Sequence, residues 1–164
     1  MYFYIDKEQC KLEQREILEF WKNNKYFSNA LELTEKIFLG DEAFNIYENF
    51  SDREDIYNIE KSDNYKNDIL KFLNNYFDIN EIVYILFAGN YPDKYRFGLS
   101  EQSYPIFEIE YKHISLWIDL IEDDNFQTIF ISDLKFNKVI EISNIIDCNQ
   151  SFETYTVSVK LSKL

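Results

Sequence analysis

The first half of the chain carries apolar residues at the spacing of amphipathic helices. Over 6–77 these residues recur every three or four positions, the period that places them on one helical face. Asp6, Ser28 and Ser62 precede such runs, and Ser and Asp are favoured at helix N-caps. The spacing predicts four helical pieces: one after Asp6, one from Ser28 to a C-terminal Gly40, a short one over 41–50 followed by a piece around Ile56 and Ile59, and one after Ser62.

Beyond Ile79 the period of the pattern changes from helical spacing to two. The run 82–88 is apolar almost throughout, as in the central strand of a sheet. The polar sequence 122–125 suits a hairpin turn between a strand that ends at Ile121 and one that begins at Phe126. Three segments alternate apolar and polar residues, which is typical of strands with one exposed face: 107–112, 114–120 and 155–161.

Helices first and strands later favour the α+β class, with N-terminal helices packed on one face of a mainly antiparallel C-terminal sheet. A single domain over 1–164 is expected, helical over about 6–77 and forming one sheet over about 82–162. The fourth helix should pack on that sheet through an apolar stripe that comprises Ile69, Leu70, Leu73 and Tyr76.

Composition adds a strong negative charge to this picture. The 164 residues include 30 acidic and 17 basic side chains, so the formal net charge is −13 at pH 7. Such a field disfavours nucleic acid and anionic membranes as direct partners and favours a basic protein partner. Hydrophobic residues make up 46% of the chain, which is enough for a folded core.

Few residues are available for cofactor chemistry, because the chain has only three Gly, two Pro, two Cys and one His. These numbers disfavour phosphate-binding glycine loops, disulfide frameworks and clustered zinc ligands, so no cofactor or metal is expected. Cys10 and Cys148 lack metal-type spacing and are expected to be thiols. The apolar start is too short for a signal peptide and no run of about 18 apolar residues follows, which predicts a cytoplasmic protein.

One short pattern has the chemistry of a metal-dependent nuclease. Pro92 and Asp93 are followed by Glu110, Tyr111 and Lys112, which resembles the degenerate signature of the PD-(D/E)xK nucleases. That resemblance implies that the acids hold a divalent metal and that the lysine orients or activates the water that attacks a phosphodiester. The same residues also fit a turn and the exposed face of a strand, and a chain with three arginines has little with which to hold DNA.

The acidic turn over 119–124 and the single histidine, His113, are two further candidates for a metal site or for catalysis. The acidic turn over 119–124 offers oxygen ligands, but it lacks the spacing and the glycine of a calcium-binding loop, so an exposed tip is expected. His113 has no nucleophile motif such as G-x-S-x-G to serve and is expected at a turn or strand edge. The sequence therefore predicts a protein that is not an enzyme.

The segment 41–63 holds eight acidic residues and two basic ones, nearly half of the net charge. Aromatic residues are interleaved with these acids. Aromatic anchors surrounded by charge of one sign suit a surface that captures a basic protein, since charge speeds the encounter and aromatic rings supply binding energy. The same spacing also fits a core-facing helical stripe beside a solvated face. The candidate partner-binding residues are Glu48, Asp52, Glu54, Asp55, Tyr47 and Tyr57, together with Asp123 and Asp124 of the acidic turn.

A small acidic α+β chain with acidic residues at 41–63 and at Glu122, Asp123 and Asp124 resembles the immunity proteins that bacteria make against toxins. The resemblance concerns composition and organisation over the whole chain, and these proteins share no motif, so no residue role is carried over. It implies tight binding to a basic toxin domain, often a nuclease, whose active site is covered by carboxylates that stand in for phosphates. A phage-type acidic inhibitor that mimics DNA and blocks a host nuclease uses the same physics. Regularly spaced surface carboxylates would favour the mimic, and one compact acidic patch the immunity protein.

Overall fold

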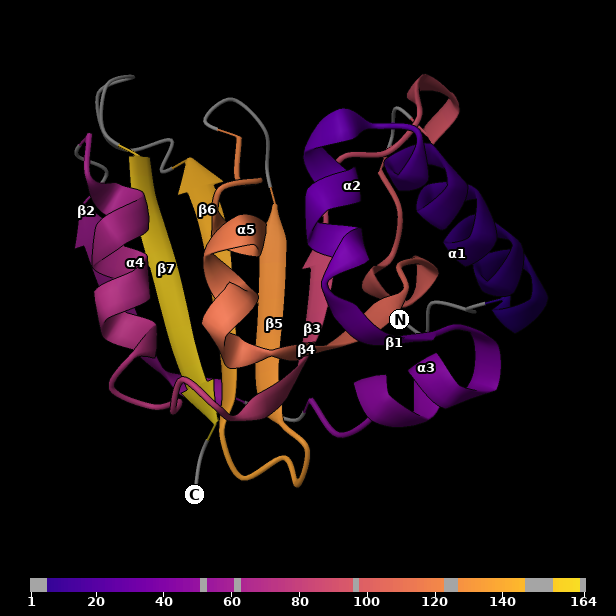
Figure 1. Ribbon diagram of the computed structural model, residues 1–164. Coiled ribbons are helices and arrows are strands. Elements are labelled where there is room, and N and C mark those ends of the chain that lie inside the picture. Colours follow the sequence, from indigo (N-terminus) through magenta and orange to yellow (C-terminus); the bar gives the residue numbers. More distant parts are fainter. Residues whose placement is uncertain are drawn as a thin grey trace.

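The computed structural model describes residues 6–50, 53–60, 63–95, 98–122, 127–146 and 155–162 (Figure 1). Within these ranges seven strands form one sheet in the order β1-β4-β3-β5-β6-β7-β2, and all neighbouring pairs are antiparallel. The strands are β1 (Thr34–Phe38), β2 (Arg53–Glu60), β3 (Ile82–Ala88), β4 (Ile106–Glu110), β5 (Thr128–Asp133), β6 (Val139–Ile146) and β7 (Tyr155–Ser162). The α-helices are α1 (Lys7–Lys22), α2 (Lys25–Glu32), α3 (Gly40–Tyr47), α4 (Tyr65–Leu73) and α5 (Ile114–Ile118), and the 3-10 helices are η1 (Asp93–Tyr95), η2 (Glu101–Ser103) and η3 (Tyr111–His113).

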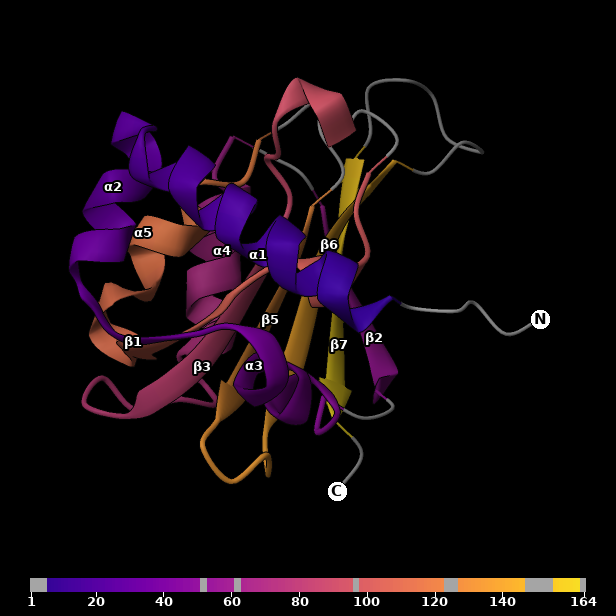
Figure 2. The ribbon, with the colours of Figure 1, turned by 90° about the vertical axis from the view of Figure 1, so that its right-hand side faces the viewer.

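Three helices cover the face of the sheet that carries Ile85 and Phe87 of β3. Figures 1 and 2 show α2, α4 and α5 on this side of the strands. The predicted α+β class with a mainly antiparallel sheet is confirmed. In the part of the chain described, no helix combines the length and the apolar character needed to cross a bilayer.

The core between these helices and the sheet is a cluster of buried aromatic rings. Trp21 of α1 stacks on Phe27 of α2 with 4.6 Å between ring centroids, and Trp117 of α5 lies 4.9 Å from Phe107 of β4. Phe87 contacts both tryptophans. Aromatic side chains remove more apolar area from water than other residues, so this cluster fixes α1, α2 and α5 on the sheet.

The opposite face of the sheet is covered by α3 and the residues that follow it. Phe50 stacks on Phe130 of β5 with centroids 5.5 Å apart, and the ring of Tyr47 meets both. Neighbouring residues of a strand point to opposite faces, and Ala88 of β3 pairs with Thr128 of β5. Both side chains therefore point to the face that carries Phe130, next to Tyr47.

The predicted second helix is wrong in its length and in its caps. Asn24, and not Ser28, caps α2 by accepting from Tyr26 N at 2.9 Å. The helix ends at Glu32, and Thr34–Phe38 pairs with β4 as an edge strand. Gly40 begins α3 in a left-handed conformation, φ +61°, instead of ending a helix. Pairing with β4 overrides the helical spacing of this segment, which a local pattern cannot reveal.

The predicted strand over 114–120 is also wrong, since the segment forms α5. Ile114, Trp117 and Ile118 are buried and lie three or four positions apart, the spacing of one helical face. The alternation of Ile114, Leu116 and Ile118 fits either structure, and it placed Trp117 on the exposed side. No strand ends at Ile121, and the turn proposed after Glu122 lies outside the described residues.

The remaining predictions for the helices and the sheet are largely confirmed. The helix α4 presents Ile69 and Leu73 fully buried to the core, with Leu70 and Tyr76 half-buried beside them. Its N-cap is Asn64, whereas Ser62 lies outside the described residues. Strand β3 is interior, between β4 and β5, as expected. The piece around Ile56 and Ile59 is the edge strand β2, so the sheet recruits two N-terminal segments that the hydrophobic pattern assigned to the helical half.

The position of Gly89, directly after β3, has no room for a side chain, because Gln127 packs against it. A Cβ atom at this position would lie 2.5 Å from Gln127 Cγ. We expect Gly89→Ala to lower the free energy of unfolding by about 1–3 kcal/mol, the usual cost of overpacking, as measured by chemical denaturation. In a Gln127→Ala background the same substitution should cost less, and an equal cost in both backgrounds would contradict the steric explanation.

Candidate functional site

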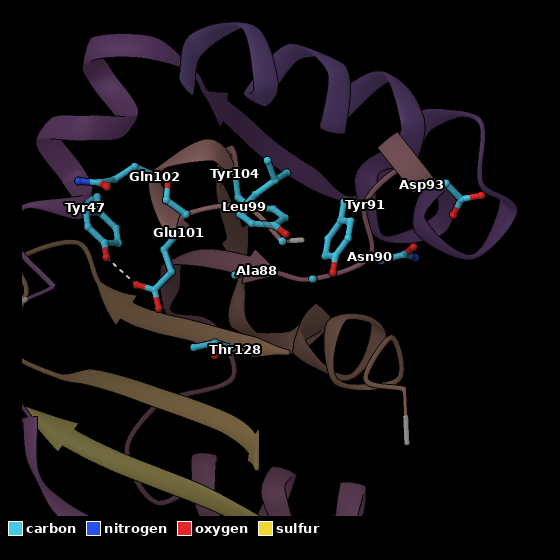
Figure 3. A pocket seen from close by; sticks show the side chains of 13 residues that line it. Tyr47, Ala88, Asn90, Tyr91, Asp93, Leu99, Glu101, Gln102, Tyr104 and Thr128 are labelled. Atoms are coloured by element: carbon cyan, nitrogen blue, oxygen red, sulfur yellow. Dashed lines mark hydrogen bonds between the residues drawn. The ribbon is translucent and has the colours of Figure 1, made fainter. Parts of the chain in front are cut away.

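A cleft of about 870 Å³ opens where β3 ends, on the face of the sheet opposite α5. Its floor is formed by Ala88 of β3 and Thr128 of β5, and its walls by the segments 89–93 and 98–104 and by Tyr47 of α3. Figure 3 shows Tyr47 and Glu101 together at one side of the cleft and Tyr91 and Asp93 toward the other. The volume lies in the range of sites that take a small molecule or a few side chains.

The charge of the cleft is acidic. Asp93 and Glu101 are its charged lining residues, and no Lys, Arg or His stands among the described residues of the lining. Lys94 is turned to α1, where its Nζ lies 2.7 Å from Glu16 Oε2. The hydroxyl of Tyr95 donates to the same carboxylate. These contacts tie the η1 turn to α1 and hold the lysine charge against Glu16.

A short hydrogen bond orders the carboxylate of Glu101. The hydroxyl of Tyr47 donates to Glu101 Oε2 at 2.5 Å, drawn as a dashed line in Figure 3. The ring of Tyr47 packs edge-on against Phe50 and Phe130, so the hydroxyl is held by the core. Hydrogen bonds to ionised groups are shorter and stronger than neutral ones, and the carboxylate is therefore fixed before any ligand arrives.

Two further tyrosines, Tyr91 and Tyr104, line the cleft. Tyr104 is buried among the aromatic core, with its ring 6.1 Å from that of Trp21. Burial raises the pKa of Tyr104 well above its usual value, with smaller contributions from Tyr91 and Glu13, so the phenol stays neutral. The cleft thus combines two carboxyl side chains with aromatic surfaces.

Asn90, in the wall of the cleft, has an unusual backbone conformation. Its φ of 53° lies in the left-handed region, which Asn tolerates better than most residues. The carbonyl oxygen of Asn90 accepts from Trp21 Nε1 at 2.7 Å. This bond satisfies the buried indole and connects the cleft directly to the aromatic core.

No protein-family model, curated protein or solved structure matches this chain. The roles of the cleft residues are therefore argued from their own geometry and chemistry.

A polar cluster on α1 supports the wall formed by η2. Gln14 bridges two segments, donating from Nε2 to Gln102 O at 2.9 Å and accepting from Gly40 N at 2.6 Å. The hydroxyl of Ser103 donates to Cys10 Sγ at 3.5 Å, and Cys10 is a free, buried thiol as expected. Cys148 lies outside the described residues. The wall is thus held by side-chain bonds from α1 and not by sheet pairing.

Glu13, in this cluster, gives the fold a pH dependence. Burial raises the pKa of Glu13 above its usual 4.5, and the negative charge of Glu16 adds to the effect. The protonated form thus favours folding below the unfolded pKa, and this contribution is lost as the pH rises through the folded pKa. We expect Glu13→Gln to raise the melting temperature at pH 7 and to raise it less at pH 4. The exposed Glu19→Gln variant is the control, and an equal gain for Glu13→Gln at both pH values would contradict the titration.

The structure divides the acidic segment 41–63 instead of presenting it as one surface. Its first part belongs to α3, where Glu48 is exposed and Tyr47 lines the cleft. Its second part runs along β2, which is three strand positions away from β5 at the edge of the sheet. The interleaved rings of Phe44 and Phe50 are buried, so they belong to the core and not to a binding surface.

Several predicted partner-binding residues lie outside what the structure describes. This applies to Asp52, Asp123 and Asp124, and to the side chains of Glu54, Asp55 and Tyr57 in β2. Next to the acidic turn, Asp119 and Glu122 line a smaller pocket of about 370 Å³ between α2 and α5. Of the eight predicted residues, Tyr47 is the one that the described structure brings into the cleft.

The three residues of the nuclease pattern are not brought together. Glu110 ends β4 and pairs with Lys112, whose Nζ lies 3.0 Å away. Asp93 follows the other end of β3, a strand of seven residues that spans about 20 Å. Lys112 belongs to η3 together with His113 and not to the strand. Within the described ranges, no group of three His, Cys, Asp or Glu side chains could hold a metal ion, so this pattern does not form a nuclease site.

Glu101, Tyr91 and Tyr104 were not predicted as site residues from the sequence. One signal could have pointed to them, because two of the three glycines and both prolines of the chain fall within 89–105. Such a concentration of turn-forming residues in a chain otherwise poor in them marks an irregular segment, and irregular segments carry many binding sites.

Proposed function

We propose that the protein acts as an immunity protein, which binds a basic toxin domain of the nuclease type and neutralises it by covering its active site. The observation that carries this proposal is the cleft, whose described lining combines Asp93 and Glu101 with three tyrosines and no basic residue. The net charge of −13 supports the same class of partner, since opposite charge accelerates encounter with a basic protein and repels nucleic acid.

Inhibition would follow from competition for cationic side chains. A nuclease holds substrate phosphates with Lys and Arg side chains, which form charge-assisted hydrogen bonds to oxygen anions. Carboxylates such as Glu101 offer the same acceptors at fixed positions. A basic loop of the partner seated in the cleft would lose its access to phosphate, and the toxin domain would be inactive in a one-to-one complex.

The concave shape favours an immunity protein over an inhibitor that mimics DNA. A DNA mimic presents rows of carboxylates that a nucleic-acid-binding groove can enclose. Here Glu101 lies beside Tyr47 inside a cleft, an arrangement that receives a side chain from the partner. Aromatic pockets that take a basic side chain are typical binding hot spots in protein complexes.

The test is capture of the partner from the native host, followed by an activity assay on the purified partner. We expect a protein with net positive charge whose nuclease activity falls in proportion to added inhibitor and ends at one equivalent. The Asp93→Asn, Glu101→Gln double variant should inhibit much more weakly. A double variant of exposed acids outside the cleft with the same charge change, Glu32→Gln and Asp63→Asn, is the control. An acidic partner, or full inhibition by the cleft variant, would contradict the proposal.

A further inference from the structure

We infer that the cleft recognises an arginine side chain of the partner, and that the pair formed by Tyr47 and Glu101 holds its guanidinium group. The inference rests on the proposed function and specifies the chemical group that the same cleft accepts. It distinguishes arginine from lysine, which carries the same charge in a different shape.

The geometry of the acceptor groups in the cleft favours a guanidinium. Tyr47 is the only described side chain that bonds to the carboxylate of Glu101, and it bonds to one oxygen at 2.5 Å. The hydroxyl oxygen of Tyr47 has given its hydrogen to Glu101, so toward a ligand it acts as an acceptor. A carboxylate and a neighbouring hydroxyl at fixed positions match the planar fork of a guanidinium, which donates several parallel hydrogen bonds. An ammonium group has no such fork.

The aromatic lining of the cleft also favours a guanidinium. Tyr91, Leu99 and the largely buried Tyr104 line the same cleft as Glu101, so a ligand in the cleft meets apolar and aromatic surfaces as well as the carboxyl group. A guanidinium is weakly hydrated and stacks on aromatic rings, whereas an ammonium is strongly hydrated and loses more on leaving water. The surroundings of Glu101 therefore favour arginine.

The described lining of the cleft is acidic, and the nearest lysine in sequence is held elsewhere. Lys94 is adjacent in sequence to Asp93, but its ammonium lies 2.7 Å from Glu16 on α1. Arg96 lies outside the described residues. Among the described residues no cation of the chain pairs with Asp93 or Glu101, so the described lining offers two carboxyl groups to a cation of the partner.

The test is an NMR titration of the full chain with two blocked tripeptides, acetyl-Gly-Arg-Gly-amide and acetyl-Gly-Lys-Gly-amide. The indole N–H of Trp21 is the reporter, since it donates to Asn90 in the cleft, and the backbone amides of β2, three strand positions from β5, are the internal reference. We expect the arginine peptide to shift the Trp21 signal and the amides of 98–104, with a Kd at least about threefold below that of the lysine peptide.

Two variants identify the group responsible. Glu101→Gln and Tyr47→Phe should each remove the preference for arginine, while Glu32→Gln, at an exposed position of α2 away from the cleft lining, should keep it. Equal affinity for the two peptides, or shifts outside the cleft, would overturn the inference. Inhibition of the captured partner is a separate readout. Equal affinity for the two peptides would therefore leave the proposed function standing. Failure of the wild-type protein to inhibit the captured partner would contradict both the proposed function and the arginine site.

Discussion

Replacing Trp21 with alanine should lower the free energy of unfolding by about 3–5 kcal/mol, the usual cost of truncating a fully buried aromatic residue. Trp21 has no exposed surface and contacts the rings of Phe27, Phe87, Tyr104 and Phe107. These neighbours come from α2, β3, β4 and the wall of the cleft. The substitution would therefore leave a cavity at the point where the helices, the sheet and the cleft meet.

Denaturation in urea measures this loss, and two variants separate its causes. Trp21→Phe keeps an aromatic ring but removes the hydrogen bond to Asn90, so it should cost clearly less than alanine while disturbing the amides of the cleft. Tyr26→Ala, at a side chain that is 69% exposed, should change stability by at most about 0.5 kcal/mol. A loss below about 1 kcal/mol for Trp21→Ala would show that this cluster does not organise the core.

The spacing of hydrophobic residues correctly predicted those helices and strands whose apolar positions in the sequence are also the buried positions in the fold. The run Ile82–Ala88 and the alternation of Phe107 and Ile109 both became interior strands, since each is buried against helices on its apolar face. The helix α1 begins at Asp6 as predicted, because the side chain of Asp6 accepts from Glu8 N and Gln9 N within its own first turn. Such signals are local and can be read from the sequence.

The period failed where two structures fit one pattern. The spacing over 114–120 fits a strand or a helix, and burial of Trp117 decided for the helix. The segment 34–38 was decided by pairing with β4, a contact more than 60 residues away along the chain, with Ile37 opposite Phe107. Neither decision is encoded within a window of ten residues.

The candidate site was predictable in its charge but not in its place. The acidic, tyrosine-rich composition indicated a basic partner, and Tyr47 was among the expected residues. The cleft, however, joins Tyr47 to Glu101 across 54 positions, and its walls are irregular segments without periodicity. The acidic segment 41–63 was predicted to form one binding surface, yet the fold separates it into α3 and an edge strand.

Neutralising the cleft should have the largest effect on binding. For the Asp93→Asn, Glu101→Gln double variant we expect affinity for the captured partner to fall by about 2 kcal/mol, roughly 30-fold, since each loss leaves a partner cation unpaired. Part of the loss should appear as slower association with a flatter salt dependence, because the Debye length shrinks from about 30 Å at 0.01 M salt to about 10 Å at 0.1 M.

Surface plasmon resonance at these two salt concentrations measures both rates. The control is the Glu32→Gln, Asp63→Asn variant, which has the same net charge as the cleft variant. The control variant should associate somewhat more slowly than the wild type, but less slowly than the cleft variant. Its dissociation rate should equal that of the wild type. Identical kinetics for the two double variants would mean that net charge alone acts, without a defined acidic site.

Hydrogen exchange of the complex tests most directly whether the cleft is the binding surface. On addition of the captured partner, the account predicts slower amide exchange over 88–93 and 98–104, and at the C-terminal end of α3, with little change along β2. Protection confined to β2 or to the helices on the other face, with unchanged exchange over 98–104, would contradict it.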